Sequence, residues 1–376
     1  MKEQVKGLRT WLEISSKAVA DNLKIFRSVI PSNVKLMAVV KSNAYGHGLW
    51  DFSKLLVKDK VDWLAVDSVV EALALRRENI EKPILVLGYT LPEMLETAAK
   101  NNISITVSNF EYFKDIKKIS TKLKIHIKVD SGMHRHGFMI GDIKKVILDI
   151  KSLGDKIEVE GLFTHFASAK NPALSIDTKK QIALFNEWRE VFVKIGFKPI
   201  CHACATGGAL LFPEAHFDMV RIGIGLYGIW PSKETKSFLQ DKIKLVPVMS
   251  WKSIIAEIKI ISAGDRIGYD FTEKFEKDTK VAMVPIGYWH GYSRTLSGIG
   301  RVYVGGVSCK VLGRVCMDII MIDISKVSKI KIGQEVEIMG REFNKDNCAD
   351  NLADLAGTST YEFLTRINPL IKRVII

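Results

Sequence analysis

The sequence predicts an α/β fold: a (β/α)8 TIM barrel followed by a mostly antiparallel β domain. Up to about residue 230, eight short apolar runs alternate with amphipathic segments. Strands buried on both faces of a parallel sheet are continuously apolar, and eight strand–helix units close a barrel. Beyond that point, short strand-like runs are separated by Gly and Asp, which is typical of antiparallel sheets. A doubly wound open sheet is the alternative for the first part.

The elements of the barrel follow from the apolar periodicity. We expect its strands at residues 36–40, 63–66, 84–87, 104–107, 124–129, 159–164, 199–203 and 219–222. The amphipathic segments are residues 16–29, 68–79, 92–101, 109–119, 142–153 and 177–195. Residues 231–242 are polar and are expected to be a linker.

The β domain is predicted from six further runs and one helix. The runs are residues 246–261, 280–285, 301–304, 308–312, 319–324 and 335–339, and the helix is residues 347–356. Residues 8–14 alternate like a strand. We therefore expect a barrel domain over residues 13–235 and a β domain over residues 236–376, with an N-terminal strand within residues 1–12 pairing with the latter.

Composition and charge restrict the class of protein. The chain is 47% hydrophobic and 26% charged, as in ordinary globular proteins. Its net charge is +13, but the lysines are scattered and no nucleic-acid-binding motif accompanies them. Five cysteines without a disulfide pattern suit a reducing compartment. No signal peptide or membrane span is visible, so we expect a cytoplasmic protein without nucleic-acid or membrane partners.

Lys41 is the most informative residue. The apolar run 36–40 ends abruptly in this lysine, which small and turn-forming residues follow. Partial desolvation at the end of a strand lowers the pKa of a lysine amine and makes it a candidate for a Schiff base. Taken alone, a lysine just beyond a strand is more often a solvated end of that strand.

The residues that follow the other strands favour the functional interpretation, because barrel active sites lie at the carboxyl ends of the strands. These residues are Arg135 after the fifth strand, His165 at the end of the sixth, His202 and Thr206 in the seventh unit, and Arg221 in the eighth. His165 alone would more often be a core histidine, and either arginine could form a surface ion pair.

The last two units also offer an anion site. Thr206, Gly207, Gly223 and Ile224 carry a hydroxyl and backbone amides at the place where barrels favour phosphate. A reactive lysine with a phosphate site suggests pyridoxal 5'-phosphate. Cys201 and Cys204 resemble half of a zinc site, but no second pair has suitable spacing, so no metal is expected.

Several motifs together resemble the alanine racemase family over nearly the whole chain. They are VVKSNAYGHG, VDSGMHRHG, THFA, RIGIGLYG, DRIGYD, PIGYWHGY, GRVCMD and TYEFLTRINP, in this order. The resemblance implies a fold-type III pyridoxal-phosphate enzyme that works as a homodimer with shared active sites. It also implies interconversion of L-alanine and D-alanine, which supplies D-alanine for bacterial peptidoglycan.

The resemblance also implies residue roles. Lys41 would bind the cofactor and act as one racemisation base, and Tyr269 of the partner subunit would be the opposite base. Arg221 would face the pyridine nitrogen and His165 the cofactor ring, while His202 would support the catalytic tyrosine. The phosphate ligands would be Tyr45, Thr206, Gly223, Ile224 and Tyr361. Arg135 and the backbone of Met317 would contact the substrate carboxylate and the cofactor oxygen, with Lys128 (a carbamate in some members), Tyr288, Arg294 and Asp318 in support.

Two departures from the family pattern stand out. Ala205 and Thr206 replace the Asn-Ser of many members, which preserves the hydroxyl. Lys170 lies where many members have an acidic pair, which changes the charge of the entry channel. The alternatives are a broad-specificity or serine racemase, a fold-type III decarboxylase, a non-catalytic cofactor carrier and, from charge alone, a nucleic-acid binder.

Overall fold

The computed structural model describes residues 4–343 and 345–376. Residues 1–3 of the expected N-terminal strand lie outside these. The chain divides into two compact units. The barrel unit comprises Val19–Ala44 and Leu49–Val246, and the β unit comprises Met1–Ala18, Tyr45–Gly48 and Pro247–Ile376. Each unit is described by itself.

Eight parallel strands close the barrel, which confirms the predicted fold class and rules out an open sheet. The barrel closes where β2 pairs with β9, with Met37 opposite Arg221. The strands are β2 (Lys35–Val39), β3 (Trp63–Val66), β4 (Ile84–Val86), β5 (Ile103–Val107), β6 (Leu123–Lys128), β7 (Ile157–Phe163), β8 (Ile200–His202) and β9 (Met219–Ile222).

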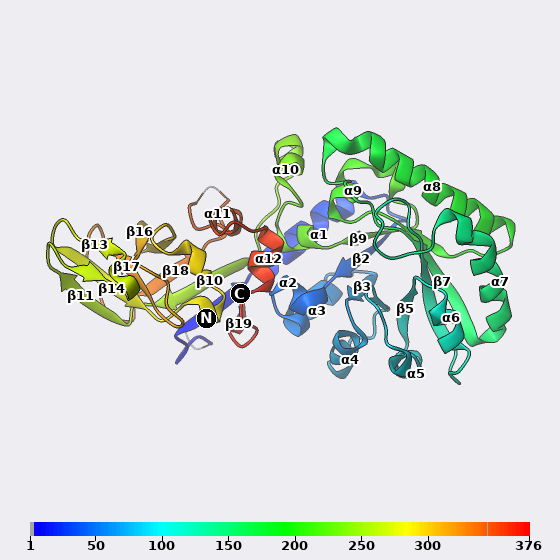
Figure 1. The fold of residues 1–376 in the computed structure, drawn as a ribbon, viewed down its shortest axis with the longest axis horizontal. Coiled ribbons are helices and arrows are strands. Elements are labelled where there is room, and N and C mark those ends of the chain that lie inside the picture. The colour runs from blue at the N-terminus through cyan, green and yellow to red at the C-terminus, as the bar shows by residue number, and fades with distance from the viewer. Residues whose placement is uncertain (1–3, 344) are drawn as a thin grey trace. The chain divides into compact units, whose positions relative to one another are not determined.

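Helices cover the outside of the strands (Figure 1). They are α1 (Ser16–Val29), α3 (Leu49–Lys58), α4 (Val69–Arg77), α5 (Leu95–Lys100), α6 (Glu111–Ile116), α7 (Ile143–Leu153) and α8 (Ser175–Lys194). Each buries an apolar stripe; in α4, for example, Val69, Ala72 and Leu75 are buried at three-residue spacing. The Ser68 hydroxyl caps α4 by accepting a hydrogen bond from the Glu71 amide.

Strand β6 departs from the apolar pattern of its neighbours. Lys124, His126 and Lys128 alternate with Leu, Ile and Ile, so the three polar side chains share one face. The pairing of β6 with β7 shifts register at His126, which lies opposite Gly161 while Ile125 lies opposite Val159. Glu160 is therefore the extra residue of a β-bulge, a feature that redirects a side chain.

Residues 231–242 were expected to be a linker, and this prediction is wrong in part. They contain the helix α10 (Lys233–Leu239). Ser232 caps this helix by accepting from the Thr235 amide, and the Ser232 and Thr235 hydroxyls both donate to the Lys170 carbonyl. A polar segment that carries its own cap forms a helix once such tertiary bonds anchor it.

The β unit contains a nine-stranded sheet, antiparallel except for the pairing of β1 with β19, and this agrees with the prediction. Its order is β11-β14-β17-β16-β15-β18-β10-β1-β19. In chain order these are β1 (Thr10–Ile14), β10 (Met249–Ile254), β11 (Glu257–Ile261), β14 (Thr279–Val284), β15 (Arg301–Val304), β16 (Val307–Leu312), β17 (Ile320–Asp323), β18 (Glu335–Met339) and β19 (Lys372–Ile375). Two short helices follow β18, α11 (Ala349–Leu355) and α12 (Thr360–Thr365).

The run 246–261 was expected as one strand and forms two. The Ile255 amide donates to the Gln334 carbonyl, and the next amide, that of Ala256, donates to the Met283 carbonyl. The chain thus changes pairing partner at this point, from β18 to β14. An apolar pattern of period two continues through such a change, so it does not reveal the break.

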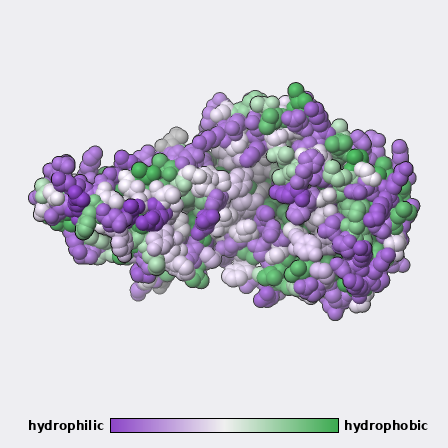
Figure 2. Space-filling view, viewed as in Figure 1, coloured by the Kyte–Doolittle hydropathy of each residue, from purple (hydrophilic) through white to green (hydrophobic). Residues whose placement is uncertain are grey.

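Hydrophilic residues cover much of the face seen in Figure 2, and hydrophobic residues form small separate patches on it. None of the helices in the described ranges combines the length and the apolar composition needed to cross a bilayer.

Candidate active site

Lys41 follows β2 and begins an unusual turn. Residues Ser42 to Tyr45 have φ between 49° and 57°, the left-handed region. Each such residue other than glycine costs about 1–2 kcal/mol, so the turn exists only because its surroundings hold it.

Glu71 holds this turn on the barrel side. Its Oε1 accepts hydrogen bonds from the backbone amides of Ser42 (2.7 Å) and Asn43 (3.3 Å), and its Oε2 accepts from the Asp67 amide (2.8 Å). Sequence reasoning missed Glu71. The signal was present, because Ser68 followed three residues later by Glu is the capping-box pattern for a helix start.

The Lys41 amine lies at the mouth of the barrel and is partly open to solvent. Its Nζ is 3.1 Å from Asp67 Oδ1, and the two side chains are 37% and 55% exposed. A small molecule can therefore reach the amine. The carboxylate beside it is a partner that sequence reasoning also missed.

Arg221 lies inside the barrel, with 2% of its surface exposed. Its guanidinium donates to His202 Nδ1 (2.8 Å), His165 Nδ1 (3.3 Å) and the carbonyls of Thr164 and Ala203 (2.8 Å each). Burial lowers the pKa of Arg221 to about 10, so it remains a cation at neutral pH. Four acceptors thus fix the plane and the orientation of the Arg221 guanidinium.

These donations determine the protonation of the two histidines. Arginine only donates, so Nδ1 of His202 and of His165 must carry a lone pair. Burial, together with the charge of Arg221, lowers the pKa of His165 to about 3 and that of His202 well below its usual value. Both rings are therefore neutral.

Four cations converge on this region: Lys41, Lys128, Arg135 and Arg221. Burial, with the charges of Arg135 and Arg221, lowers the pKa of Lys128 to about 8. Lys128, Arg135 and His165 line one pocket together with Asp130. A concentration of positive charge around neutral histidines favours anionic ligands.

Thr206 and the loop after β9 form a polar cradle. Thr206, at the start of α9 (Thr206–Leu211), is buried, and its Oγ1 accepts from the amides of Gly223 (3.2 Å) and Gly225 (3.3 Å). A Cβ added to Gly225 would lie 2.3 Å from the Phe26 ring and 2.7 Å from Thr206 Cγ2. Only glycine lets the backbone approach the hydroxyl this closely. Ile224 is buried within the same loop.

The other predicted site residues belong to the β unit. Tyr45 and Tyr361 have ring centroids 6.1 Å apart, and burial raises the pKa of Tyr45 to about 12 and that of Tyr361 above its usual value. Tyr288 and Arg294 line one pocket of about 400 Å³. The Met317 carbonyl accepts from the Trp289 amide.

Tyr269 is 68% exposed. The next residue, Asp270, is left-handed, with φ 59°, and its Oδ2 lies 2.6 Å from Arg314 Nε. This ion pair stabilises the turn that carries the phenol. Asp318 Oδ1 lies 3.9 Å from His290 Nδ1 on the neighbouring loop.

Comparison with known proteins identifies the family. The model of the alanine racemase N-terminal domain matches residues 14–231, and that of the C-terminal domain matches residues 248–375. The alanine racemase of Leptospira interrogans is 36% identical over 374 residues, which cover 98% of this chain and 96% of the relative. The chain belongs to the alanine racemase family. It is accordingly an isomerase.

Solved structures of alanine racemases agree. The enzyme from Bacillus anthracis with bound L-Ala-P has a TM-score of 0.90 and 36% identity, and covers 98% of this chain and 95% of its own. The enzyme from Bartonella henselae with covalently bound pyridoxal phosphate has a TM-score of 0.86 and 25% sequence identity. The match covers 98% of this chain and 99% of the Bartonella chain.

The two departures from the alanine racemase pattern have clear positions. The Thr206 hydroxyl lies within hydrogen-bond distance of two amides, those of Gly223 and Gly225. The Lys170 backbone packs against α9, because a Cβ added to Gly207 would lie 2.8 Å from the Lys170 Cα. The Lys170 carbonyl, bound by the first turn of α10, fixes this segment.

Cys201 and Cys204 behave as buried thiols. Cys204 Sγ donates to the Ala215 carbonyl (3.2 Å), and burial raises its pKa to about 12. Burial also raises the pKa of Cys201, to about 11. A metal ligand requires the thiolate, which these surroundings disfavour.

Proposed function

We propose that the protein interconverts L-alanine and D-alanine with pyridoxal 5'-phosphate bound to Lys41. One observation carries the proposal: the Lys41 amine, the cationic cluster and the Thr206 cradle belong to the same barrel mouth. The cradle and the four cations suit a dianionic phosphate and a substrate carboxylate. The two solved relatives described above, one with bound L-Ala-P and one with covalently bound pyridoxal phosphate, support the same ligand chemistry.

The residues that would hold the cofactor are those that the family resemblance assigns. Thr206, Gly223 and Ile224 would bind the phosphate, with Tyr45 and Tyr361. Arg221 would donate to the ring nitrogen, and His165 would lie beside the ring. When bound, pyridoxal phosphate supplies an electron-withdrawing ring that makes the Cα proton of an amino acid acidic.

Two bases would move the proton. The Lys41 amine would take or return it on one face of Cα, and the Tyr269 phenol of a second copy would do so on the other. The exposure of Tyr269 supports this assignment, since its phenol is open to another molecule. His202 would support that tyrosine through Arg221, and the protein would work as a homodimer with shared sites.

Substrate contacts are assigned to Arg135 and to the backbone of Met317, with Tyr288 and Arg294 at the entry channel and Asp318 as a supporting residue. Lys128 would be a carbamate. Its pKa of about 8 leaves a share of neutral amine, which adds to CO2 and releases one proton. The product is an anion beside Arg135, which would relieve the repulsion between these cations.

The biological assignments are D-alanine supply for peptidoglycan and a cytoplasmic location. The buried free thiols Cys201 and Cys204 support a reducing compartment. The domain boundaries that we propose remain 13–235 and 236–376.

The deciding experiment is racemisation in D2O with added pyridoxal phosphate. L-Alanine should give D-alanine that carries deuterium at Cα, and Lys41→Ala should abolish both. L-Serine tested in parallel measures the breadth of the substrate pocket; a serine rate equal to the alanine rate would favour a broad-specificity racemase. A lysine-linked cofactor with no D-product would instead indicate a carrier or a decarboxylase.

A further inference from the structure

A chain of buried polar groups crosses the barrel interior from Arg221 to Glu160. Arg221 donates to His202 Nδ1, and His202 Nε2 lies 2.9 Å from His126 Nδ1. His126 Nε2 lies 3.4 Å from Glu160 Oε2. Both histidines are completely buried. The chain thus joins an active-site arginine on β9 to a carboxylate on β7 through β8 and β6.

The direction of the hydrogen bonds follows from the chain's two ends. Arg221 can only donate, so His202 accepts at Nδ1 and carries its proton on Nε2. That proton is donated to His126 Nδ1, which places the His126 proton on Nε2. Among the described residues, no acceptor meets strict hydrogen-bond geometry at this nitrogen, and the Glu160 carboxylate is the ion-pair partner that faces it.

Glu160 is ionised at this position. Burial alone would raise its pKa, but the interaction with His126, the hydrogen bond donated by the Ser104 hydroxyl and the charge of Lys124 outweigh that effect, and the pKa lies below its usual value. Burial lowers the pKa of His126 despite the nearby carboxylate, so the ring is neutral. The chain therefore has a cation at one end, an anion at the other and two neutral rings between.

The backbone is adapted to this arrangement. Glu160 is the extra residue of the β-bulge, and Gly161, which follows it, leaves room for the imidazole: an added Cβ would lie 2.0 Å from His126 Nδ1. The Phe163 ring stacks on the His202 ring at 4.7 Å and 5° and restricts its rotation.

Arg221 needs such a counter-charge. Among the described residues, no carboxylate forms an ion pair with Arg221, although its guanidinium is buried and lies close enough to Lys128 to lower the pKa of that lysine. An unpaired buried charge is costly. A carboxylate linked to it by polarisable, hydrogen-bonded rings offsets part of that cost.

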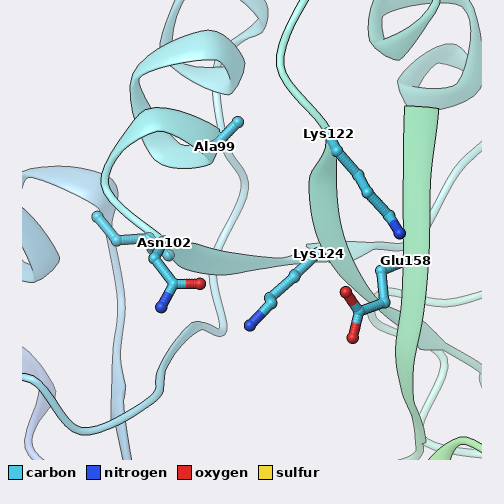
Figure 3. A pocket seen from close by; sticks show the side chains of 6 residues that line it. Ala99, Asn102, Lys122, Lys124 and Glu158 are labelled. Atoms are coloured by element: carbon cyan, nitrogen blue, oxygen red, sulfur yellow. The ribbon is translucent and has the colours of Figure 1, made fainter. Parts of the chain in front are cut away.

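The hydrogen-bonded chain reaches solvent at its Glu160 end. Lys124 Nζ lies 3.8 Å from Glu160 Oε1, and Lys124 also lines a pocket of about 100 Å³ with Lys122 and Glu158. Figure 3 shows these three side chains around the pocket. Glu158 thus carries the same charge as Glu160 and also lies near Lys124, but it does not belong to the hydrogen-bonded chain.

We propose that Glu160 is a positioning residue of the racemase site, which acts through His126 and His202 to fix the direction in which Arg221 donates. The inference rests on the proposed function for its catalytic consequence. Its structural content, the proton positions on the two rings, is independent of activity. A carboxylate that orients a functional histidine is a general device, and loss of such a partner commonly costs about tenfold or more.

The first test needs no variant. The holoenzyme, with its eight histidines labelled with ¹⁵N, should show protonated Nε2 and bare Nδ1 for both His126 and His202. Single histidine variants assign the signals. A proton on Nδ1 of either ring would overturn the proposal even if the enzyme racemises alanine. Conversely, the predicted tautomers in an enzyme that does not racemise alanine would leave the chain intact and overturn only the proposed function.

The second test compares Glu160→Gln with Glu158→Gln. The Glu160→Gln side chain lacks the negative charge, and its NH2 group can compete as a donor at His126 Nε2, so it should weaken the preference of both rings for the proton on Nε2. We expect altered His126 and His202 signals and a kcat lower by about tenfold, with KM within about twofold of wild type. Glu158→Gln should change neither. A Glu160→Gln enzyme with wild-type kcat would refute the positioning role, whether or not its histidine signals moved.

Discussion

Glu71 Oε1 accepts a 2.7 Å hydrogen bond from the backbone amide of Ser42, the residue next to Lys41. The reactive amine is thus held by a turn that is costly in itself and is stabilised by a carboxylate on the first turn of α4. The precision of the site depends on this contact as much as on the lysine.

We therefore expect Glu71→Ala to impair both folding and catalysis. Three amides would lose a charged acceptor, which should lower the free energy of unfolding by about 1–3 kcal/mol. Displacement of Lys41 should lower kcat/KM about tenfold or more. Urea unfolding and racemisation kinetics measure the two effects. Glu78→Ala, which removes a surface partner of Lys54 near the end of the same helix, is the control and should change neither by much. Equal effects of the two variants would argue against the role of Glu71.

If the active sites are shared between two subunits, as we propose, inactive variants should complement each other. Lys41→Ala and Tyr269→Phe should each be nearly inactive as purified proteins. Mixed under conditions that permit subunit exchange, half of the dimers should be mixed and carry one intact site, which gives about a quarter of the wild-type activity. Activity assays before and after exchange measure this. A mixture that contains heterodimers by mass spectrometry and stays inactive would place both bases in one subunit.

Arg221→Lys should destabilise the protein even without cofactor. A lysine cannot donate to His202, His165 and two buried carbonyls at once, so some of these acceptors would lose their donor. We expect the free energy of unfolding to fall by about 3 kcal/mol or more. Arg27→Lys, at a half-exposed pair with Asp62, is the control and should cost less than about 1 kcal/mol. Similar losses of unfolding free energy for the two variants would show that the buried Arg221 guanidinium contributes little to stability.

Lys128 makes stability depend on pH. Its pKa is about 8 in the folded chain and about 10.5 when unfolded. Between these values the unfolded state binds more protons, so its contribution to stability increases as pH rises. In CO2-free buffer, the cofactor-free Lys128→Met protein should exceed wild type by about 3 kcal/mol at pH 7 and by less than about 1 kcal/mol at pH 10. Lys144→Met, at an exposed lysine, should show no such trend. A difference independent of pH would contradict the low pKa.

The barrel could be predicted from sequence because its strands are short apolar runs separated by amphipathic helices. The resemblance likewise provided Lys41, Arg221 and Thr206, since each follows a strand within a recognisable motif. The link from His126 to Glu160 could not be found in this way. It depends on a one-residue bulge in β7 and on side chains of neighbouring strands that meet only when those strands pair, although the alternation of β6 was a visible signal. Helix α10 was missed because polar composition outweighed the cap at Ser232.

The cations at the barrel mouth have a consequence for the cofactor-free protein. Lys41 is paired with Asp67, but Lys128 is repelled by Arg135 and Arg221, so the protein without a bound anion retains an electrostatic frustration that folding does not remove. Any anion that relieves it binds the folded state alone and shifts the equilibrium toward that state. The surplus of charge that makes the empty barrel the less stable form therefore also favours the binding of an anionic ligand there.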